Sequence, residues 1–452
     1  MISLSAIRSR AESLFPSLTD ELAAIVAIPS ISAAPDKAPV YRSAEHVQAK
    51  FAELGLDTSI RTAQCPDGSE GCPAVVGLKH VSDDAPTVLL YAHHDVQPVG
   101  DASLWDSDPW VAEIRDGRMY GRGSSDDGAG IVVHLGALQV LGDDLPVNVV
   151  VYIEGEEESG SPSFTAFVEK YKDDLVSDRI IVCDADNWRV GEPAVTSTLR
   201  GVVTADVKVS VLKGAQHSGA FGGPVLDAVT LASRLIATLH DENGDVAVAG
   251  LPSCDKADVD YPEDLFRSDA GMLDGVQLAG TGDIAARLWT KPAIAVIGWD
   301  QRTIADAANA IAPNTTFELS MRTPPGSDSK ECFEALKKHL IEHAPFGAHV
   351  EVTLQEAGPS FQAEKSPAVD DLEASLKDAW GVDPVTIGCG GSIPFIADFK
   401  AAFPEADVLV TGVEDPQTAA HSENESMDMG DLKAAIIAEA CLLARTGHAL
   451  ED

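Results

Sequence analysis

The chain has 452 residues, with 32 lysines and arginines against 72 aspartates and glutamates, a formal net charge of −40. A chain of this length is too long for a single hydrophobic core, which favours two domains. With 45% hydrophobic residues, the chain has enough apolar side chains to fill two cores. The acidic excess excludes a nucleic-acid binder and a protein that docks on anionic lipid, because both need lysine and arginine to neutralise phosphates. The simplest explanation of the charge is solubility, as in a salty cytoplasm.

The sequence favours a cytoplasmic location without a membrane. The amino-terminal segment lacks the apolar run and cleavage site of a signal peptide, and no apolar stretch approaches the roughly 18 residues of a membrane span. Seven scattered cysteines, an odd number, indicate reduced thiols. The alternative is an exported protein in which Cys65 and Cys72 form a bridge. No CxxC pair occurs, so a thiolate zinc site is not expected.

Short apolar runs separated by helical patterns predict an α/β domain with a mostly parallel sheet flanked by helices. The spacing of apolar residues predicts helices over 43–54 and 128–141, and another after Ser161-Pro162, with Ser161 as N-cap. Strands buried on both faces are predicted at 87–92, 147–153, 179–183 and 407–411.

The pattern changes after residue 199, where strands with one polar face are predicted at 202–212, 316–321 and 349–355. Helical patterns at 225–240 and 330–343 accompany them, and an acidic, loop-like insertion covers about 250–285. Because the earlier pattern returns after 360, we expect a discontinuous catalytic domain (1–198 and 361–452) with a smaller α+β domain inserted at 199–360.

Acidic and imidazole side chains follow the predicted buried strands. These groups are His93-His94-Asp95, the acidic run 154–158, Asp184 and Asp186, and His421, while Asp126-Asp127 precedes a helix. Each group alone has an ordinary explanation as a helix N-cap, a solvated acidic face or a surface histidine. Because parallel strands bring their carboxyl ends to one edge, we expect the groups to converge, and only cations would relieve their repulsion. Mixed His/Asp/Glu ligation suits Zn²⁺ or Mn²⁺, with Co²⁺ as a substitute.

Seven motifs occur in an order that resembles a known family: AHHDVQPV, YGRGSSDDGAG, EGEEESGS, CDADN, HSGAFGG, GGSIP and AHSENE. They are similar to those of the co-catalytic di-zinc metallopeptidases, which include carnosinases, cytosolic nonspecific dipeptidases, acetylornithine deacetylase and succinyl-diaminopimelate desuccinylase. The resemblance spans about residues 90 to 425, and HSGAFGG and GGSIP fit the dipeptidase branch. It implies a zinc-exopeptidase-like catalytic domain, an inserted lid and dimerisation domain, and a homodimer formed through that domain.

The resemblance also implies two divalent ions per subunit, Zn²⁺ first, with Mn²⁺ or Co²⁺ as alternatives. It assigns His93 and Asp186 to one ion, Glu158 and His421 to the other, and Asp126 as the bridge between them. A cis peptide bond often joins the bridging aspartate to the next residue, here Asp127.

The same resemblance implies the catalytic groups. Asp95 would hold the His93 ring by its other nitrogen, and Glu157 would be the general base. A water shared by two cations loses its proton near neutral pH, and Glu157 would accept that proton and pass it to the leaving amine. His217, reaching the site from a partner subunit, would stabilise the oxyanion. Glu154 and Glu156 are left as surface acids or as groups that support the ligands.

Four residues are candidates for binding the substrate. Arg322 resembles the residue that grips a substrate carboxylate, although a surface arginine paired with a neighbouring acid fits the sequence nearly as well. Gly391, Ser392 and Asn309 would add hydrogen bonds near it. The chain departs from the family at Gly128, where a lysine is usual, and at Gly388-Cys389, where charged residues are common. Both departures affect the expected substrate preference rather than the hydrolytic chemistry.

Three functions are therefore weighed. The first is hydrolysis of dipeptides or short peptides, and the second is removal of an acyl group from an N-acyl amino acid. The third is a catalytically silent, acidic cation-binding protein, and the presence of Glu157 together with all five ligands argues against it. The native metal, the preferred substrate and the role of the insertion at 250–285 are not readable from the residues.

Overall fold

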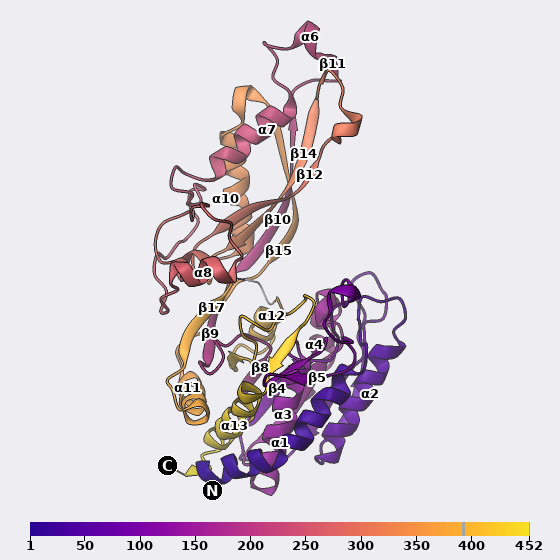
Figure 1. The fold of residues 1–452 in the computed structure, drawn as a ribbon, viewed down its shortest axis with the longest axis vertical. Helices are drawn as coiled ribbons and strands as arrows, with labels where there is room; N and C mark the ends of the chain where they lie inside the picture. The colour runs from indigo at the N-terminus through magenta and orange to yellow at the C-terminus, as the bar shows by residue number, and fades with distance from the viewer. Residues whose placement is uncertain (391–393, 452) are drawn as a thin grey trace. The chain divides into compact units, whose positions relative to one another are not determined.

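The computed structural model describes residues 1–390 and 394–451, which form two compact units (Figure 1). Unit 1 comprises Met1–Thr196, Ala363–Thr386 and Asp398–Asp452, and unit 2 comprises Ser197–Gln362 and Ile387–Ala397. The chain therefore leaves and re-enters unit 1 close to the sequence-based boundaries at 199 and 360. In addition, the short segment Ile387–Ala397 belongs to unit 2.

Unit 1 is built on a six-stranded, mostly parallel sheet in the order β18-β8-β4-β7-β3-β2. Its strands are β2 (Asp57–Arg61), β3 (Ala74–Lys79), β4 (Thr87–His93), β7 (Asn148–Glu154), β8 (Arg179–Cys183) and β18 (Asp407–Thr411). The four predicted strands are mutually parallel neighbours, so their carboxyl ends share one edge. The antiparallel pair β2 and β3 was not predicted; neither has the long apolar run that marks the central strands.

Helices cover both faces of this sheet, as the apolar character of its central strands requires. They are α1 (Leu4–Val26), α2 (Ala38–Glu53), α3 (Gly128–Leu141), α4 (Phe164–Lys170), α5 (Lys172–Leu175), α11 (Pro367–Trp380), α12 (Pro394–Ala402) and α13 (Met429–Thr446). Leu90 and Val151 pack in the core formed with α1, α3 and α13. On the opposite face, Tyr91 and Tyr152 pack edge-on against Phe399 of α12. Unit 1 is thus a three-layer α/β/α arrangement (Figure 1).

The starts of two helices in unit 1 differ in how well the sequence predicts them. Helix α3 has its predicted bounds, and the side chain of Asp127 caps it by accepting the amide of Gly130 at 3.0 Å. The prediction that Ser161 caps the next helix is wrong, because α4 begins at Phe164 and Ser161 has a φ of 51°. The carboxylate of Glu156 accepts the amide of Ser163 at 2.8 Å and so holds this turn.

Unit 2 contains an antiparallel sheet in the order β12-β14-β10-β15, covered on one face by two helices. The elements are β10 (Gly201–Ser210), β12 (Ala293–Asp300), β14 (Asn314–Thr323), β15 (His349–Gly358), α7 (Ala228–Ile236) and α10 (Ser329–Glu342). Val203, Val207 and Leu319 face these helices, which matches the alternation in the sequence. Strand β12 was not predicted, and it forms an edge of the sheet.

Short elements complete unit 2 and its connections. They are β9 (Ala194–Leu199), β11 (Gln216–His217), α6 (Ser218–Phe221), α8 (Glu263–Asp269), α9 (Ile284–Trp289), β13 (Ala310–Ile311), β16 (Phe361–Gln362) and β17 (Val385–Cys389). The acidic insertion at 250–285 contains α8. Nζ of Lys291 lies 2.9 Å from Asp255 of the insertion and 2.7 Å from Asp245, which precedes it, so this lysine links the insertion to the rest of unit 2. Unit 1 also carries the short strands β1 (Ile2–Ser3), β5 (Glu113–Arg115), β6 (Arg118–Tyr120), β19 (Ser426–Asp428) and β20 (Leu450–Glu451).

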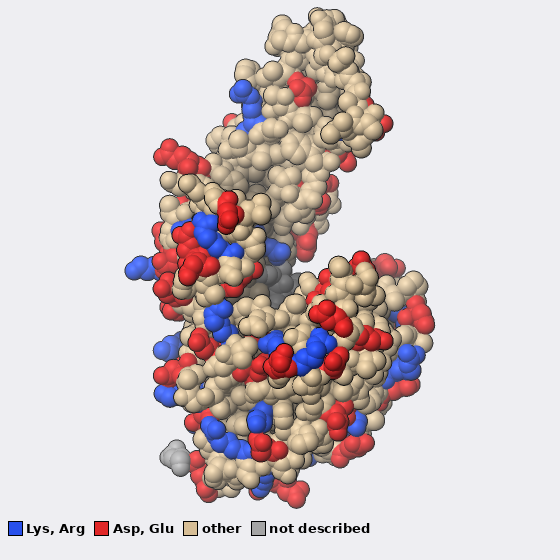
Figure 2. Space-filling view, in the orientation of Figure 1, with Lys and Arg blue, Asp and Glu red and all other residues tan. Residues whose placement is uncertain are grey.

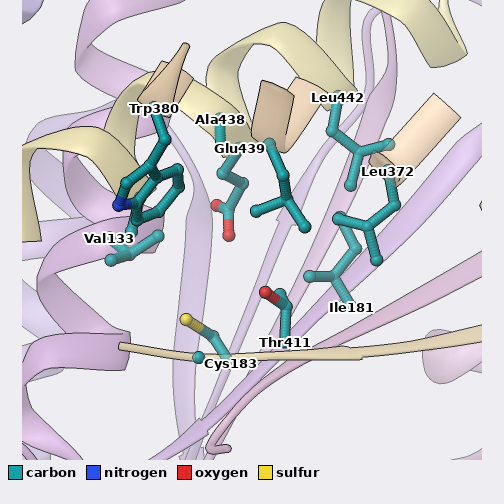
Figure 3. A pocket seen from close by; sticks show the side chains of 12 residues that line it. Val133, Ile181, Cys183, Leu372, Trp380, Thr411, Ala438, Glu439 and Leu442 are labelled. Carbon is teal, nitrogen blue, oxygen red and sulfur yellow. The ribbon is translucent and has the colours of Figure 1, made fainter. Parts of the chain in front are cut away.

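A small cavity lies inside unit 1 between α3, α11, α13 and the sheet (Figure 3). Its volume of about 20 Å³ is room for about one water molecule. Most of its lining is aliphatic, but Cys183, Thr411 and Glu439 supply polar atoms. All seven cysteines are free thiols, Cys65 and Cys72 included. Within the described part of the chain, no helix combines the length and apolar character needed to cross a bilayer.

Candidate active site

Two groups of potential ligands meet beyond the carboxyl ends of β4, β7 and β8 in unit 1. One group comprises His93, Asp127 and Asp184, and the other comprises Asp126, Glu158 and His421; within each, the ligand atoms lie within 4.8 Å of one another. The groups arise from five separate stretches of the chain that the parallel sheet and the loops beyond it bring together. This is the convergence that the sequence pattern predicts.

Asp126 offers one carboxylate oxygen to each group. Its Oδ1 lies 3.0 Å from Nε2 of His93, and its Oδ2 lies 2.8 Å from Nε2 of His421. Nε2 of His421 is also 3.1 Å from Oε2 of Glu158. The peptide bond between Asp126 and Asp127 is cis, as the resemblance implied. Asp127 itself is engaged elsewhere, because its carboxylate accepts the amides of His93 and Gly130, each at 3.0 Å.

The structure brings Asp184 rather than Asp186 to His93. Oδ1 of Asp184 lies 3.7 Å from Nε2 of His93, whereas Asp186 is exposed and pairs through its backbone with Glu414. The sequence-based choice of Asp186 therefore stays a prediction, and Asp184 is the aspartate of CDADN whose carboxylate lies beside His93. A signal for Asp184 exists in the sequence, because this residue directly follows the last buried residue of β8, as His93 ends β4.

Asp95 supports the site differently from the expectation. The Nδ1 atom of His93 lies 3.0 Å from the backbone oxygen of Asp95 and 3.5 Å from its carboxylate. That fully buried carboxylate instead accepts the amides of Glu157 and Glu158, both at 3.1 Å. Asp95 therefore positions the turn that carries the base and a ligand, in addition to orienting the ring through its main chain.

Glu158 is held by a residue that the sequence did not single out. Gln97 donates its amide to Oε1 of Glu158 at 3.0 Å and its side-chain nitrogen to Oε2 at 2.8 Å. The neighbouring Glu157 points toward the first group, with its Oε2 4.0 Å from Nε2 of His93. The two adjacent glutamates thus differ in role: Glu158 is fixed by hydrogen bonds as a potential ligand, and Glu157 lies beside the potential ligands.

The acids at 154 and 156 are not surface residues. Glu154 is buried and accepts a hydrogen bond from the Tyr91 hydroxyl at 2.7 Å, and burial raises its pKa to about 8. Glu156 is buried and accepts the amides of Cys72 at 2.7 Å and Ser163 at 2.8 Å. Both side chains hold the protein around the turn that bears Glu157.

The electrostatics of the site favour bound cations. Burial raises the pKa of Glu157 well above its ordinary value; the His93 charge opposes this rise, and Asp184 and Asp126 add to it. Hydrogen bonds to Asp126 and Glu158 raise the pKa of His421 to about 10. Nε2 of His93 is buried and makes no hydrogen bond within the described residues. The carboxylates of the site need a positive partner, and the two imidazoles can supply nitrogen ligands. This combination fits divalent cations such as Zn²⁺.

The remaining predicted site residues lie in unit 2. His217 and Asn309 are exposed and adjacent, since His217 pairs with Ala310 and the amide of Ser218 donates to Asn309 O at 3.1 Å. Arg322 is half-buried on β14, opposite Val202 of β10. Gly391 and Ser392 lie outside the described residues.

Comparison with known proteins identifies the family. The model of the peptidase family M20/M25/M40 matches residues 89–445. This chain belongs to that family. A cysteinylglycine-S-conjugate dipeptidase of Corynebacterium striatum is 35% identical over 438 residues, covering 94% of this chain and 95% of that protein. The human beta-Ala-His dipeptidase is 27% identical over 394 residues, covering 81% and 76% of the two chains.

Solved structures support the same fold. The dipeptidase Dug1p from Saccharomyces cerevisiae superposes with a TM-score of 0.79 and 23% identity, covering 99% of each chain. This likeness bears on the fold alone, and it agrees with the α/β unit and the additional antiparallel sheet described above.

Proposed function

We propose that this protein is a metal-dependent dipeptidase that hydrolyses the single peptide bond of its substrates. The observation that carries the proposal is the Asp126 carboxylate, which offers one oxygen to each of two ligand groups beside Glu157. Relatives named as dipeptidases, including one 35% identical over nearly the whole chain, support the substrate class.

His93 and Asp184 would hold one divalent cation, Glu158 and His421 the other, and Asp126 both. Zn²⁺ fits this donor set first, and Mn²⁺ or Co²⁺ would serve. When bound, such ions lower the pKa of a water and polarise a peptide carbonyl. Glu157 accepts the proton of the attacking water and then donates it to the leaving amine. Asp95 keeps Glu157 in place through the amide hydrogen bond.

Two arginines in unit 2 form a receptor for a carboxylate. Burial and the charge of Arg322 lower the pKa of Arg200 to about 10. The Arg200 guanidinium donates to carbonyl oxygens, including that of Gly390 at 3.2 Å. Neither arginine has a carboxylate partner in residues 1–390 and 394–451. Two neighbouring cations without an acid favour binding of the free carboxylate of a dipeptide, with Arg322 as the bidentate partner.

Glu414 favours a substrate with a free amino group over an N-acyl amino acid. Oε1 of Glu414 is buried and has no hydrogen bond among the described residues. Burial, followed by the charges of Asp126 and Asp186, raises the pKa of Glu414 well above its ordinary value. An ammonium group beside this carboxylate would supply the missing donor and positive charge, whereas an acyl group would supply neither.

The missing family side chains have a packing explanation. A Cβ atom at Gly128 would lie 2.3 Å from the backbone oxygen of Gly123, so a side chain there would require the backbone to shift. At Gly388, a Cβ atom would lie 2.6 Å from Cβ of Trp289. The packing around both glycines in this chain therefore leaves no free space for a side chain, and any substrate contact that relatives make at these positions would have to come from other residues here.

Unit 2 supports the proposed homodimer. The edge strand β12 exposes Val296, Ile297 and Trp299, with 40%, 56% and 37% of each residue accessible. Acidic and basic side chains are scattered over much of the visible surface, but few charges lie around α6 and β11 (Figure 2). An apolar edge strand can pair with the same strand of a second copy, and His217 would then serve the partner's site. The seven free cysteines support a reducing, cytoplasmic location.

The test is a panel of dipeptides, their N-acetyl and C-amide derivatives, and N-acetyl amino acids, assayed with Zn²⁺, Mn²⁺ or Co²⁺ and after chelation. We expect dipeptides with both ends free to be cleaved fastest and activity to disappear with the chelator. Faster cleavage of N-acetyl amino acids would favour the deacylase, and no turnover with any metal would favour the silent cation-binding protein.

A further inference from the structure

Glu425 accepts four hydrogen bonds from one short segment of the chain. Its Oε1 accepts the amides of Ser125 at 3.0 Å and Asp126 at 3.1 Å. Its Oε2 accepts the amide of Gly123 at 3.0 Å and Nη1 of Arg122 at 2.6 Å. The residue is completely buried, so no water can replace these partners.

The segment held by Glu425 has no regular secondary structure of its own. It links β6 to α3, and Gly123 adopts a φ of 76° within it. Backbone amides in such a segment find no acceptors in a helix or a sheet ladder, so a buried acceptor from elsewhere fixes their position. The last of these amides belongs to Asp126, whose carboxylate faces both ligand groups.

Glu425 also lies four residues after His421, in the loop that carries this ligand. Arg122 strengthens the connection, because its Nη2 donates to the backbone oxygens of Ser422 at 3.0 Å and Pro98 at 3.2 Å. The backbone oxygen of Glu425 accepts the amide of Gly121 at 3.0 Å. The His421 loop and the Asp126 segment are therefore tied together by one carboxylate and one guanidinium.

We propose that Glu425 is a positioning residue of the metal centre. It contacts neither ion nor substrate, but it fixes the distance between Asp126 and His421 and so sets the affinity of the centre for divalent cations. The relevance of this inference to catalysis rests on the proposed function. The affinity for Zn²⁺ can be measured whether or not the protein cleaves dipeptides. Residues that orient metal ligands commonly change metal affinity 10- to 100-fold when they are lost.

The decisive variant is Glu425→Gln, which keeps the size of the side chain. The amide retains one acceptor oxygen and turns an NH₂ group toward N–H donors, so it cannot accept all four bonds. Glu439→Gln is the matched control, because it makes the same change at a buried glutamate that touches no proposed ligand. Zn²⁺ binding would be measured by competition with a chromophoric chelator, together with the dipeptide rate at rising Zn²⁺ concentration.

We expect Glu425→Gln to weaken Zn²⁺ binding about 10- to 100-fold, with the rate largely recovered at saturating Zn²⁺, and Glu439→Gln to bind as the wild type does. A folded Glu425→Gln protein with wild-type Zn²⁺ affinity would overturn the proposal. If the wild type binds Zn²⁺ but cleaves no dipeptide, the proposed function fails while the affinity test of Glu425 still decides.

A second measurement covers the case in which Glu425→Gln does not fold. Hydrogen exchange of the segment 121–127 would be followed by mass spectrometry in the chelated wild-type protein. We expect slow exchange, because Glu425 holds three amides of this segment without help from an ion. Fast exchange that becomes slow only on adding Zn²⁺ would show that the ion, not Glu425, positions Asp126.

Discussion

A buried ion pair behind the site predicts how the stability of unit 1 depends on pH. Nδ1 of His134 lies 2.9 Å from both carboxylate oxygens of Glu439, and its Nε2 lies 3.0 Å from the backbone oxygen of Tyr91. Both ring nitrogens face acceptors, so the protonated ring satisfies this position and a neutral ring does not. Cys183 lines the cavity beside Glu439 (Figure 3), and burial keeps the pKa of its thiol well above the ordinary value.

Burial alone would lower the pKa of His134, but the charge of Glu439 and the hydrogen bonds raise it above the ordinary value of 6.5. A raised pKa in the folded state means that the stabilisation is fully present below about pH 6.5 and is lost as the pH rises through the folded pKa. Within that window, one linked proton changes the free energy of unfolding by about 1.4 kcal/mol per pH unit.

The variant Glu439→Gln separates the contribution of the His134–Glu439 pair to the pH dependence of stability from the contributions of other titrating groups. In the variant, the amide of Gln can donate to Nδ1 of a neutral His134, whose Nε2–H donates to Tyr91, so the position is satisfied without a charge. Urea unfolding of the chelated proteins would be measured from pH 6 to pH 9 and the variant subtracted from the wild type. We expect the difference in unfolding free energy to favour the wild type most at pH 6 and to shrink above about pH 6.5. Parallel curves would refute the assignment of a protonated His134.

Three further predictions concern the site itself. Glu157→Gln should lower kcat about 10²- to 10⁴-fold while the metal content stays at the wild-type value, and a full-rate variant would exclude Glu157 as the base. Asp184→Asn should lose bound metal, as measured by atomic emission after dialysis, whereas Asp186→Asn should retain it; the reverse result would restore the sequence-based choice. Arg322→Met should raise KM for dipeptides about ten-fold or more and leave the slow cleavage of C-amidated dipeptides unchanged, and equal effects on both substrates would remove the carboxylate contact.

The sequence predicts the architecture of unit 1 well because its central strands are unusually apolar. Residues such as Leu90 and Val151 lie in strands buried on both faces, and the polar groups that follow these strands must lie at one edge. The edge strand β2 was missed because its sequence, DTSIR, has no apolar run. The edge strand β12 does contain one, AIAVI, although the structure leaves much of it exposed. The prediction for Ser161 was wrong because Glu156 determines that turn: its carboxylate accepts the amide of Ser163, a contact that the N-cap pattern does not include.

Within the site, the side chains that gather there were easier to predict from the sequence than the contacts that each of them makes. His93, Asp126, Glu158 and His421 are found together, but the choice between two aspartates in CDADN required coordinates. The same limit applies to Gln97 and Glu425, whose roles depend on hydrogen bonds between distant segments. A sequence pattern indicates which side chains can bind a metal, while the packing of loops decides which of them do.

The order of the ligands along the chain has a consequence for biosynthesis. His93 and His421 stand at opposite ends of the ligand set, and all of unit 2 except Ile387–Ala397 is inserted between Thr196 and Ala363. A ribosome must therefore translate more than nine-tenths of the protein before a complete centre can exist, and the inserted unit is free to fold while unit 1 waits for its last strand and helices. In the proposed site, the complete ligand set would therefore form late in synthesis, and a nascent chain that ends before His421 would lack one ligand.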